Sequence, residues 1–218
     1  MKDLTYHFGN GNDKDVVFGF PSHVHFGDQI TFINVVKNLN LPSYQINPTN
    51  DHGRELCSYF FQACQITDLP ATHHFHSPPD TMTDSYNCIY HKIDGEWKTN
   101  TKRYISYSFD AQFNTKEKIP PYLDELLLEC SSLFPQYEVV KLGKHIGLKN
   151  TIKYLSESAV AVTIDNGIAH LVRCTSIPHI IIEHEWSLER GFPRSCYSSY
   201  HKCKSQESVI EIIRSIQH

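Results

Sequence analysis

The chain has 218 residues, of which 40% are hydrophobic and 12% aromatic. This composition supports a packed core and argues against disorder, and the length fits one large or two small α/β units. The formal net charge is -4 with histidine counted as neutral. That charge gives no support to a generally basic surface for nucleic acid, although a local basic patch stays compatible with it.

Membrane and export signals are weak in this sequence. No stretch reaches the roughly 20 apolar residues that span a bilayer, and no apolar signal region follows the first seven residues. We therefore expect a cytoplasmic protein without a membrane span. The seven cysteines include no Cys-x-x-Cys pair, so the sequence predicts free thiols rather than a disulfide framework or a zinc ribbon.

The first half of the chain alternates short apolar runs with stretches of helical periodicity. The pattern predicts strands at 16–20, 44–46 and 88–90, a helix that begins at Asp28 and a second helix over 55–65. An aspartate at a helix start can cap exposed backbone N–H groups.

The second half shows the alternation more clearly. Prolines and polar residues weaken the pattern before residue 102, so we expect an N-terminal domain over 1–100 and a C-terminal domain over 101–218. The expected elements of the C-terminal domain are strands at 104–109, 137–142, 160–164 and 179–182 and helices over 120–134, 149–156, 167–174 and 206–216. Strands alternating with helices form βαβ units, so the fold class is α/β with parallel sheets covered by helices.

A polar turn follows the expected strand 160–164, with the sequence Asp165-Asn166-Gly167-Ile168-Ala169-His170. Ligands of open parallel sheets bind beyond the carboxyl ends of strands. Gly167 lets a ligand approach the backbone, and the first turn of the following helix offers N–H groups to a diphosphate. His170 can add a hydrogen bond or a charge, and Asp165 is expected to cap the turn or orient a neighbour. An ordinary strand-to-helix turn explains the same residues.

A second polar turn follows the expected strand 16–20 and contains His23, His25, Gly27 and Asp28. The dipole of the helix stabilises an ionised carboxylate at its N-terminus. Asp28 can therefore take a proton from an acceptor hydroxyl as a general base. The competing interpretation is that Asp28 only caps the helix.

These two turns resemble the heptosyltransferase family of bacterial lipopolysaccharide synthesis, which has the GT-B architecture. The family carries a Gly-Asp pair near its N-terminus, matched by Gly27-Asp28, and an Asp-Ser-Gly-x-x-His-Leu motif in its donor domain, matched by residues 165–171 with asparagine in place of serine. The resemblance implies two small Rossmann-like parallel-sheet domains facing a cleft. It makes Asp28 the catalytic base and makes Asn166, Gly167 and His170 donor contacts. From their places in the two turns, we assign Asp165 to the donor site as well, and Gly27, His23 and His25 to the acceptor side.

The resemblance also implies the remaining parts of a donor site. The family places a lysine after the first strand of the donor domain, and Lys116 and Lys118 both stand in the matching stretch. Either can neutralise a diphosphate, and both are equally compatible with a solvated surface. Glu183 begins the stretch Glu183-His184-Glu185-Trp186 after the last expected strand, where the nucleotide base and ribose would be held. A plain surface loop or metal binding explains this stretch as well. The implied reaction moves a sugar with inversion from a nucleoside-diphosphate sugar to an acceptor hydroxyl, without a metal or cofactor.

Several interpretations stay open beside this one. His73, His74 and His76, with Cys64 and Cys88 nearby, could bind zinc or form a surface or acceptor-loop cluster, and their spacing matches no known structural zinc site. The expected acceptor is a glycan or a lipid-linked sugar. The alternatives are a phage-type DNA glycosyltransferase acting on a hydroxymethylated pyrimidine, whose binding would weaken with rising salt, and a non-catalytic nucleotide-sugar-binding module.

Overall fold

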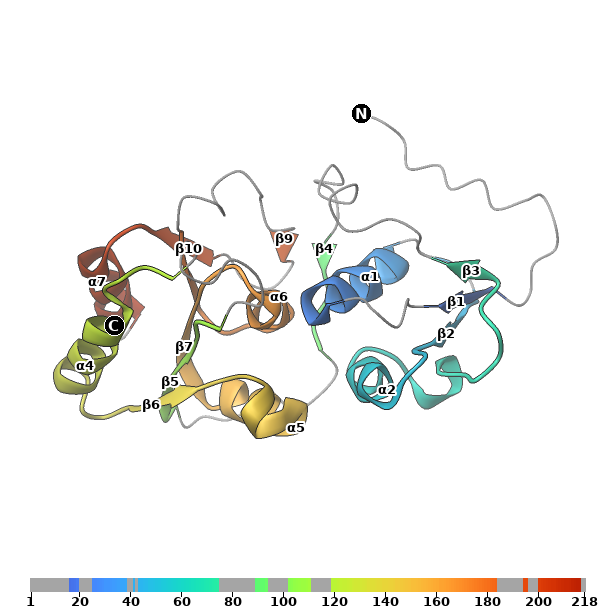
Figure 1. Ribbon diagram of the computed structural model, residues 1–218, viewed down its shortest axis with the longest axis horizontal. Coiled ribbons are helices and arrows are strands. Elements are labelled where there is room, and N and C mark those ends of the chain that lie inside the picture. Colours follow the sequence, from blue (N-terminus) through green and yellow to red (C-terminus); the bar gives the residue numbers. More distant parts are fainter. Residues whose placement is uncertain are drawn as a thin grey trace, which may run out of the picture.

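Two parallel sheets carry the fold, one in each half of the chain (Figure 1). The structure is a computed structural model and describes residues 16–19, 25–38, 41, 43–74, 89–93, 102–110, 119–183, 194–195 and 200–216. None of the helices in these ranges is long and apolar enough to cross a membrane.

The N-terminal half contains a three-stranded parallel sheet in the order β2-β1-β3. Its strands are β1 (Val17–Gly19), β2 (Gln45–Asn47) and β3 (His73–His74), and its helices are α1 (Phe26–Asn38), α2 (Asp51–Ser58) and the 3-10 helix η1 (Ala63–Gln65). The predicted strands at 16–20 and 44–46 are confirmed. The predicted helix over 55–65 is wrong in its bounds, because Asn50 caps α2 with a 2.7 Å bond from the N–H of Gly53 and the chain turns into the core at Phe60 and Phe61.

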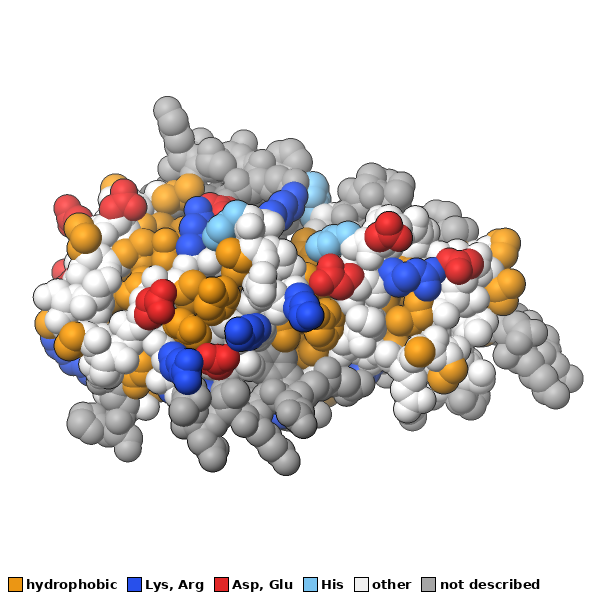
Figure 2. Space-filling view, turned by 90° about the horizontal axis from the view of Figure 1, so that it is seen from below, with side chains coloured by type: hydrophobic (Ala, Val, Ile, Leu, Met, Phe, Trp, Pro, Cys, Tyr) orange, Lys and Arg blue, Asp and Glu red, His pale blue; other side chains and the backbone are white. Residues whose placement is uncertain are grey.

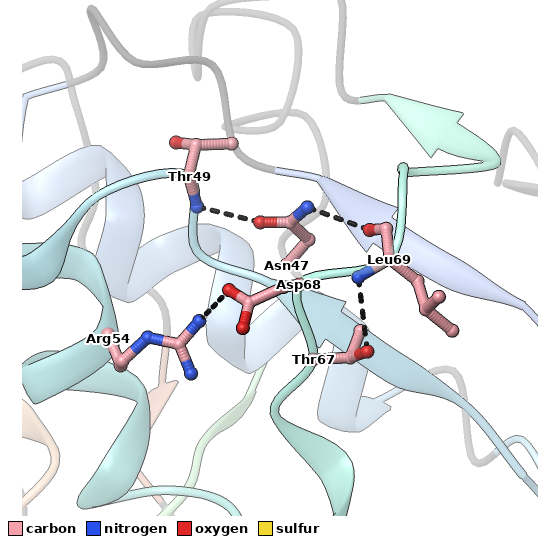
Figure 3. Close-up of polar contacts among 6 residues, drawn as sticks. All are labelled: Asn47, Thr49, Arg54, Thr67, Asp68 and Leu69. Carbon is pink, nitrogen blue, oxygen red and sulfur yellow. Dashed lines mark hydrogen bonds and ion pairs between the residues drawn. The ribbon is translucent and has the colours of Figure 1, made fainter.

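Side-chain hydrogen bonds hold the turn between β2 and α2 (Figure 3). Thr49 has a φ of 59°, a left-handed conformation that is unfavourable for a β-branched residue. The Oδ1 of Asn47 accepts from the N–H of Thr49 at 3.0 Å, and its Nδ2 donates to the oxygen of Leu69 at 2.7 Å. Arg54 forms an ion pair with Asp68 beside this turn. These bonds fix the start of α2 at the carboxyl edge of the sheet.

The C-terminal half contains a five-stranded parallel sheet in the order β10-β8-β7-β5-β6. Its strands are β5 (Tyr104–Ser108), β6 (Glu138–Lys141), β7 (Ser158–Thr163), β8 (His179–Ile182) and β10 (Tyr200–Cys203). Its helices are α4 (Leu123–Leu133), η3 (Lys144–Ile146), α5 (Gly147–Ser156), α6 (Gly167–Arg173) and α7 (Gln206–Ile216). Every element predicted for this half is confirmed, and the pattern missed β10 of this sheet.

Helices cover both faces of this sheet, as the sequence predicted. Along β7 and just beyond it, Val160, Val162 and Ile164 pack with residues of α4 and α7 on one face. Ala161, between them, packs with residues of α5 and α6 on the opposite face. This alternation is the two-residue period of a strand, and both faces of the strand are apolar because the sheet is buried between two layers of helices.

One apolar core continues from the N-terminal half into the C-terminal half. It joins residues of β1 and α1, such as Phe18 and Ile33, with Leu155 of α5 and with Leu171 and Val172 of α6. Figure 1 shows α1 and α6 side by side between the two sheets. A short parallel pair, β4 (Ile89–Tyr90) with β9 (Arg194–Ser195), adds a second link. The three-stranded sheet takes its strands from before residue 100 and the five-stranded sheet from after it. The division into two domains at that point stays a prediction.

Candidate functional site

The carboxyl ends of β5 and β7 meet where an open parallel sheet binds ligands. In the five-stranded sheet β5 lies between β6 and β7. The next strand in the chain, β6, pairs on one side of β5, and the strands that follow it are added on the other side. This reversal is a topological switch point, and ligands of open α/β sheets bind outside the strand ends at such points. The three-stranded sheet has the same arrangement, since β1 lies between β2 and β3.

Asn166 joins the two strand ends at this switch point. Its Oδ1 accepts from the N–H of Ala169 at 3.0 Å and caps α6. Its Nδ2 lies 3.1 Å from both the backbone oxygen and the Oγ of Ser108 and 3.1 Å from the backbone oxygen of Asp110. The sequence predicted that Asp165 caps the turn or orients a neighbour. The residue that caps α6 is Asn166 instead, and its extended backbone is the usual conformation of an N-cap. One side chain therefore fixes the start of α6 against the end of β5.

His170 lies one turn into α6 and contacts the N-terminal half. Its Nδ1 forms a hydrogen bond with the hydroxyl of Tyr90 and lies 3.4 Å from the Oγ1 of Thr31. The Thr31 hydroxyl lies 3.3 Å from the Tyr90 hydroxyl and 3.1 Å from the backbone oxygen of Gly27. The residue predicted to contact the donor is thus anchored by side chains of the opposite half.

His170 is uncharged at neutral pH in this environment. Burial of the ring, together with the nearby charge of Arg173, lowers the pKa of His170 from 6.5 to about 4. Arg173 is itself buried, with its guanidinium carbon 4.3 Å from the centre of the Tyr200 ring, a cation–π contact. Burial also lowers the pKa of His179, whose Nε2 lies 2.8 Å from the Oγ1 of Thr163. A neutral imidazole carries no charge to offer a ligand, and the role of His170 toward a donor stays a prediction.

Two glycines bring the N-termini of α1 and α6 into contact. A Cβ built on Gly27 would lie 2.8 Å from the Cδ2 of His170, and a Cβ built on Gly167 would lie 2.9 Å from the Cδ1 of Phe26. Both distances are shorter than real Cβ contacts, so only glycine allows this approach. The sequence predicted that a ligand approaches the backbone at Gly167. In the structure, the direction in which a Cβ of Gly167 would point is filled by Phe26 and Gly27 of the N-terminal half.

Asp28 lies in the first turn of α1, half-buried, beside the glycine that contacts His170. The helix begins at Phe26, and the exposed His25 precedes it, with its backbone oxygen accepting from Gln29 at 3.0 Å. The predicted helix start at Asp28 is therefore wrong by two residues, and Asp28 lies inside the first turn rather than at the cap position. An acidic residue in the first turn is still favoured by the helix dipole.

Two ion pairs lie at the carboxyl ends of the strands of the five-stranded sheet. Lys141 pairs with Asp110 at 2.8 Å, and Lys202 pairs with Glu183, whose side chain is only 6% exposed, at 2.7 Å. Each carboxylate, through its hydrogen bond, raises the pKa of its lysine. Figure 2 shows basic and acidic side chains interspersed over the face that it displays, with no continuous basic area among the described residues.

Some predicted residues lie outside the described ranges, namely His23, Lys116, Lys118, His76 and Cys88. His73 and His74 form β3, where their backbones pair with β1, and Cys64 is exposed. Within the described part of the chain, no group of three or more His, Cys, Asp or Glu residues could hold a metal ion.

Sequence reasoning missed Tyr90, Thr31 and the two lysines of the ion pairs. Tyr90 and Lys141 each end a strand that the sequence did predict, and a polar group at a strand end was the available signal. Thr31 carried no such signal, because it stands inside a helix among apolar residues.

The architecture defines a class of protein: an α/β protein with two Rossmann-like parallel sheets in a GT-B-like arrangement. The fold is similar to the crystal structure of the bacterial iron-containing dodecameric glycosyltransferase TibC from enterotoxigenic E. coli H10407, with a TM-score of 0.57 and 14% identity. It is also similar to the dodecameric iron-containing heptosyltransferase TibC in complex with ADP-D-β-D-heptose, with a TM-score of 0.56 and 15% identity.

Each match covers 88% of this chain and 64% of the TibC chain, so this chain spans less than two thirds of those proteins. No protein-family profile and no curated protein matches the sequence. The likeness therefore rests on the arrangement of strands and helices.

Proposed function

We propose that the chain is a nucleotide-sugar-dependent glycosyltransferase whose donor binds at the carboxyl ends of β5 and β7. The observation that carries the proposal is the position of Asn166, which ties β5 to α6 at the topological switch point. Solved structures with a similar fold are glycosyltransferases, and one is a complex with ADP-D-β-D-heptose. A nucleoside-diphosphate sugar is accordingly the proposed donor.

The donor site is formed from the residues around the switch point. Asn166 and Gly167 form the turn beside the donor, with Asp165 before them. His170 is neutral and contributes a hydrogen bond. Lys141 and Lys202, each ion-paired at a carboxyl end of this sheet, are two further cations proposed to approach the diphosphate, beside Lys116 or Lys118. Glu183, at the end of β8, lies where a ribose or base would be held.

The proposed reaction is a direct displacement at the anomeric carbon. The acceptor oxygen attacks this carbon while the bond from the carbon to the phosphate oxygen breaks, and the nucleoside diphosphate leaves with the electron pair. Asp28 takes the proton of the acceptor hydroxyl. One displacement inverts the configuration of the sugar. We assign Gly27 and His25 to the acceptor side, together with His23, whose position lies outside the described residues. The proposed acceptor is a glycan or a lipid-linked sugar.

Thermal unfolding with nucleoside diphosphates and their sugars tests the donor site, beginning with ADP and ADP-sugars. A ligand that binds only the folded state, at about 100 times its dissociation constant, adds about 2.7 kcal/mol of stability. We expect a rise in Tm with one nucleotide that is lost in His170→Ala and kept in His201→Ala, a change at an exposed histidine. No rise with any nucleotide would contradict the proposed donor site.

Turnover of the donor tests the base. Hydrolysis of the nucleotide sugar, with water as acceptor, needs the same proton transfer and no knowledge of the natural acceptor. We expect Asp28→Asn to lower this rate by about 10²- to 10⁴-fold, the usual contribution of a general base, while the Tm shift with nucleotide is kept. An unchanged rate in Asp28→Asn would remove Asp28 from the mechanism.

A further inference from the structure

Asp110 lies between the turn that contains Asn166 and the end of β6. Its backbone oxygen accepts from the Nδ2 of Asn166 at 3.1 Å, and its Oδ1 lies 2.8 Å from the Nζ of Lys141. β5 and β6 are neighbours in the sheet (Figure 1), and Tyr107 pairs with Lys141 in their register. The ion pair of Asp110 and Lys141 therefore stands at the strand ends where the donor diphosphate is proposed to bind.

The loop after β6 brings further polar groups to the same strand ends. Gly143 has a φ of 151°, a conformation that L side chains rarely adopt. A Cβ built on Gly143 would lie 3.5 Å from the Oδ2 of Asp110 and 3.5 Å from the Nδ1 of His145. Lys144 and His145 are both exposed. The Asp110 carboxylate thus shares the carboxyl ends of β5 and β6 with two lysines and a histidine.

A carboxylate and a phosphate make the same kind of contact with a lysine, since both accept charge-assisted hydrogen bonds from its ammonium group. The hydrogen bond to Asp110 is the main cause that raises the pKa of Lys141. A phosphate that shared the Nζ of Lys141 with Asp110 would lie beside a second negative charge, which is unfavourable. The phosphate and the Asp110 carboxylate therefore compete for Lys141.

Exposure makes this ion pair easy to exchange. The side chain of Lys141 is 43% exposed and that of Asp110 is 62% exposed. Water screens such pairs, so breaking one changes an equilibrium constant by at most about fivefold. The ion pair of Lys202 differs, because the Glu183 side chain is only 6% exposed and would be left as an unpaired buried charge. Of these two lysines, Lys141 is the one that a ligand can recruit at little cost.

We propose that Asp110 is an internal counter-ion of the donor site, which holds Lys141 while the site is empty and releases it to the diphosphate on binding. The inference rests on the proposed function, since it takes a nucleoside-diphosphate sugar as the donor. Part of the binding free energy is lost in breaking the ion pair and in bringing a phosphate near the carboxylate. Asp110 thereby lowers the affinity for the nucleotide, and the reverse exchange helps the nucleoside diphosphate to leave after transfer of the sugar.

Isothermal titration calorimetry of ADP with the full chain tests the exchange. Asp110→Asn keeps the size of the side chain and removes its charge, so ADP should bind about 2- to 10-fold more tightly. Asp110→Ala should also tighten binding, which separates the loss of charge from a new contact made by the amide. Adenosine, which has no phosphate, should bind these variants and the wild type equally.

Asp68→Asn is the matched control. It removes a carboxylate from the exposed ion pair with Arg54 in the N-terminal half, and it changes the net charge by the same amount. The affinity for ADP should stay unchanged in this variant. An equal gain in Asp68→Asn would assign the effect to net charge and overturn the role of Asp110.

Lys141→Met should weaken ADP binding. In that background Asp110→Asn should have a smaller effect than in the wild type, because no lysine is left to release and the two changes are coupled. Weaker binding of ADP to Asp110→Asn, or an effect of the same size with and without Lys141, would overturn the proposal.

Inorganic pyrophosphate separates this inference from the identity of the donor. If pyrophosphate binds Asp110→Asn more tightly than the wild type and loses this gain in Lys141→Met, while ADP binds neither protein, the exchange stands and the nucleotide donor fails. If ADP binds and Asp110→Asn leaves its affinity unchanged, the donor site stands and the exchange fails. No binding of either ligand to Asp110→Asn would overturn both.

Discussion

Asn166 holds β5 and α6 together through both ends of its amide, and substitutions can separate the two functions. Asn166→Ala removes the cap on Ala169 and the bonds to Ser108 and Asp110. Asn166→Ser keeps a capping oxygen but is too short to keep those bonds. Asn166→Asp keeps the cap and places a carboxylate oxygen where the Nδ2 now lies 3.1 Å from two carbonyl oxygens.

The magnitudes follow from the number of bonds that each variant loses. An N-cap contributes about 1 kcal/mol. The amide has two protons, each worth about 1 kcal/mol net in a hydrogen bond. We therefore expect Asn166→Ala to lower the free energy of unfolding by about 3 kcal/mol and Asn166→Ser by about 2 kcal/mol. Asn166→Asp should cost at least as much as Asn166→Ser, because of repulsion from the two carbonyls.

Urea denaturation measures these differences, provided that the slope with denaturant is unchanged among the variants. Asn150→Ala, which removes a single exposed bond to Ile146, serves as the control and should cost less than the changes at Asn166. Equal stability of the alanine and serine variants would refute the cap. A neutral Asn166→Asp would refute the bonds to β5.

Three other predictions concern packing, pH and charge. Gly27→Ala and Gly167→Ala should each cost about 1–3 kcal/mol by overpacking, seen as a lower Tm; unchanged Tm values would contradict the close approach of α1 and α6. Because the folded pKa of His170 is about 4 and the unfolded pKa 6.5, its contribution should be complete above pH 6.5. It should fall by up to about 3 kcal/mol as the pH drops to 4. His170→Gln should then flatten the profile of stability against pH, and an equally steep profile would contradict the shift. Lys202→Met should lower the free energy of unfolding by about 1–2 kcal/mol, because it leaves the buried Glu183 carboxylate without its cation. This loss is smaller than for a fully buried ion pair, since the Lys202 side chain is 40% exposed. Adding Glu183→Gln should restore part of that loss, and additive effects would contradict the coupling.

The sequence predicted the parallel α/β class and most elements because apolar runs and helical periodicity mark buried strands and helices locally. It missed β10, since Tyr200 to Cys203 form an edge strand whose middle residues are exposed and polar. It missed β3 because a strand of two histidines has no apolar pattern. The start of α1 was misplaced because glycine is a weak helix former, so Gly27 gave no local signal of belonging to the helix.

The site was predicted in its sequence segments but not in its contacts. Asn166 and His170 stand out because they follow a buried strand. The bonds of Asn166 to Ser108 depend on the order of the strands, which no local pattern contains. Tyr90 and His170 are 80 residues apart, and their contact depends on how the two halves pack. The positions of Lys116, Lys118 and His23 lie outside the described residues, so their roles stay predictions.

Residues of β1, α1, α5 and α6 share one apolar core. Binding of a donor at β5 and β7 should therefore affect the stability of the N-terminal half as well. Opening the N-terminal half would expose apolar surface of the C-terminal half, so the two halves should open together rather than separately. A nucleotide bound at β5 and β7 would then slow amide hydrogen exchange in β1 as well as in β7. Amide hydrogen exchange in both halves of the molecule, and not only in the donor half, would then depend on whether a nucleotide is bound.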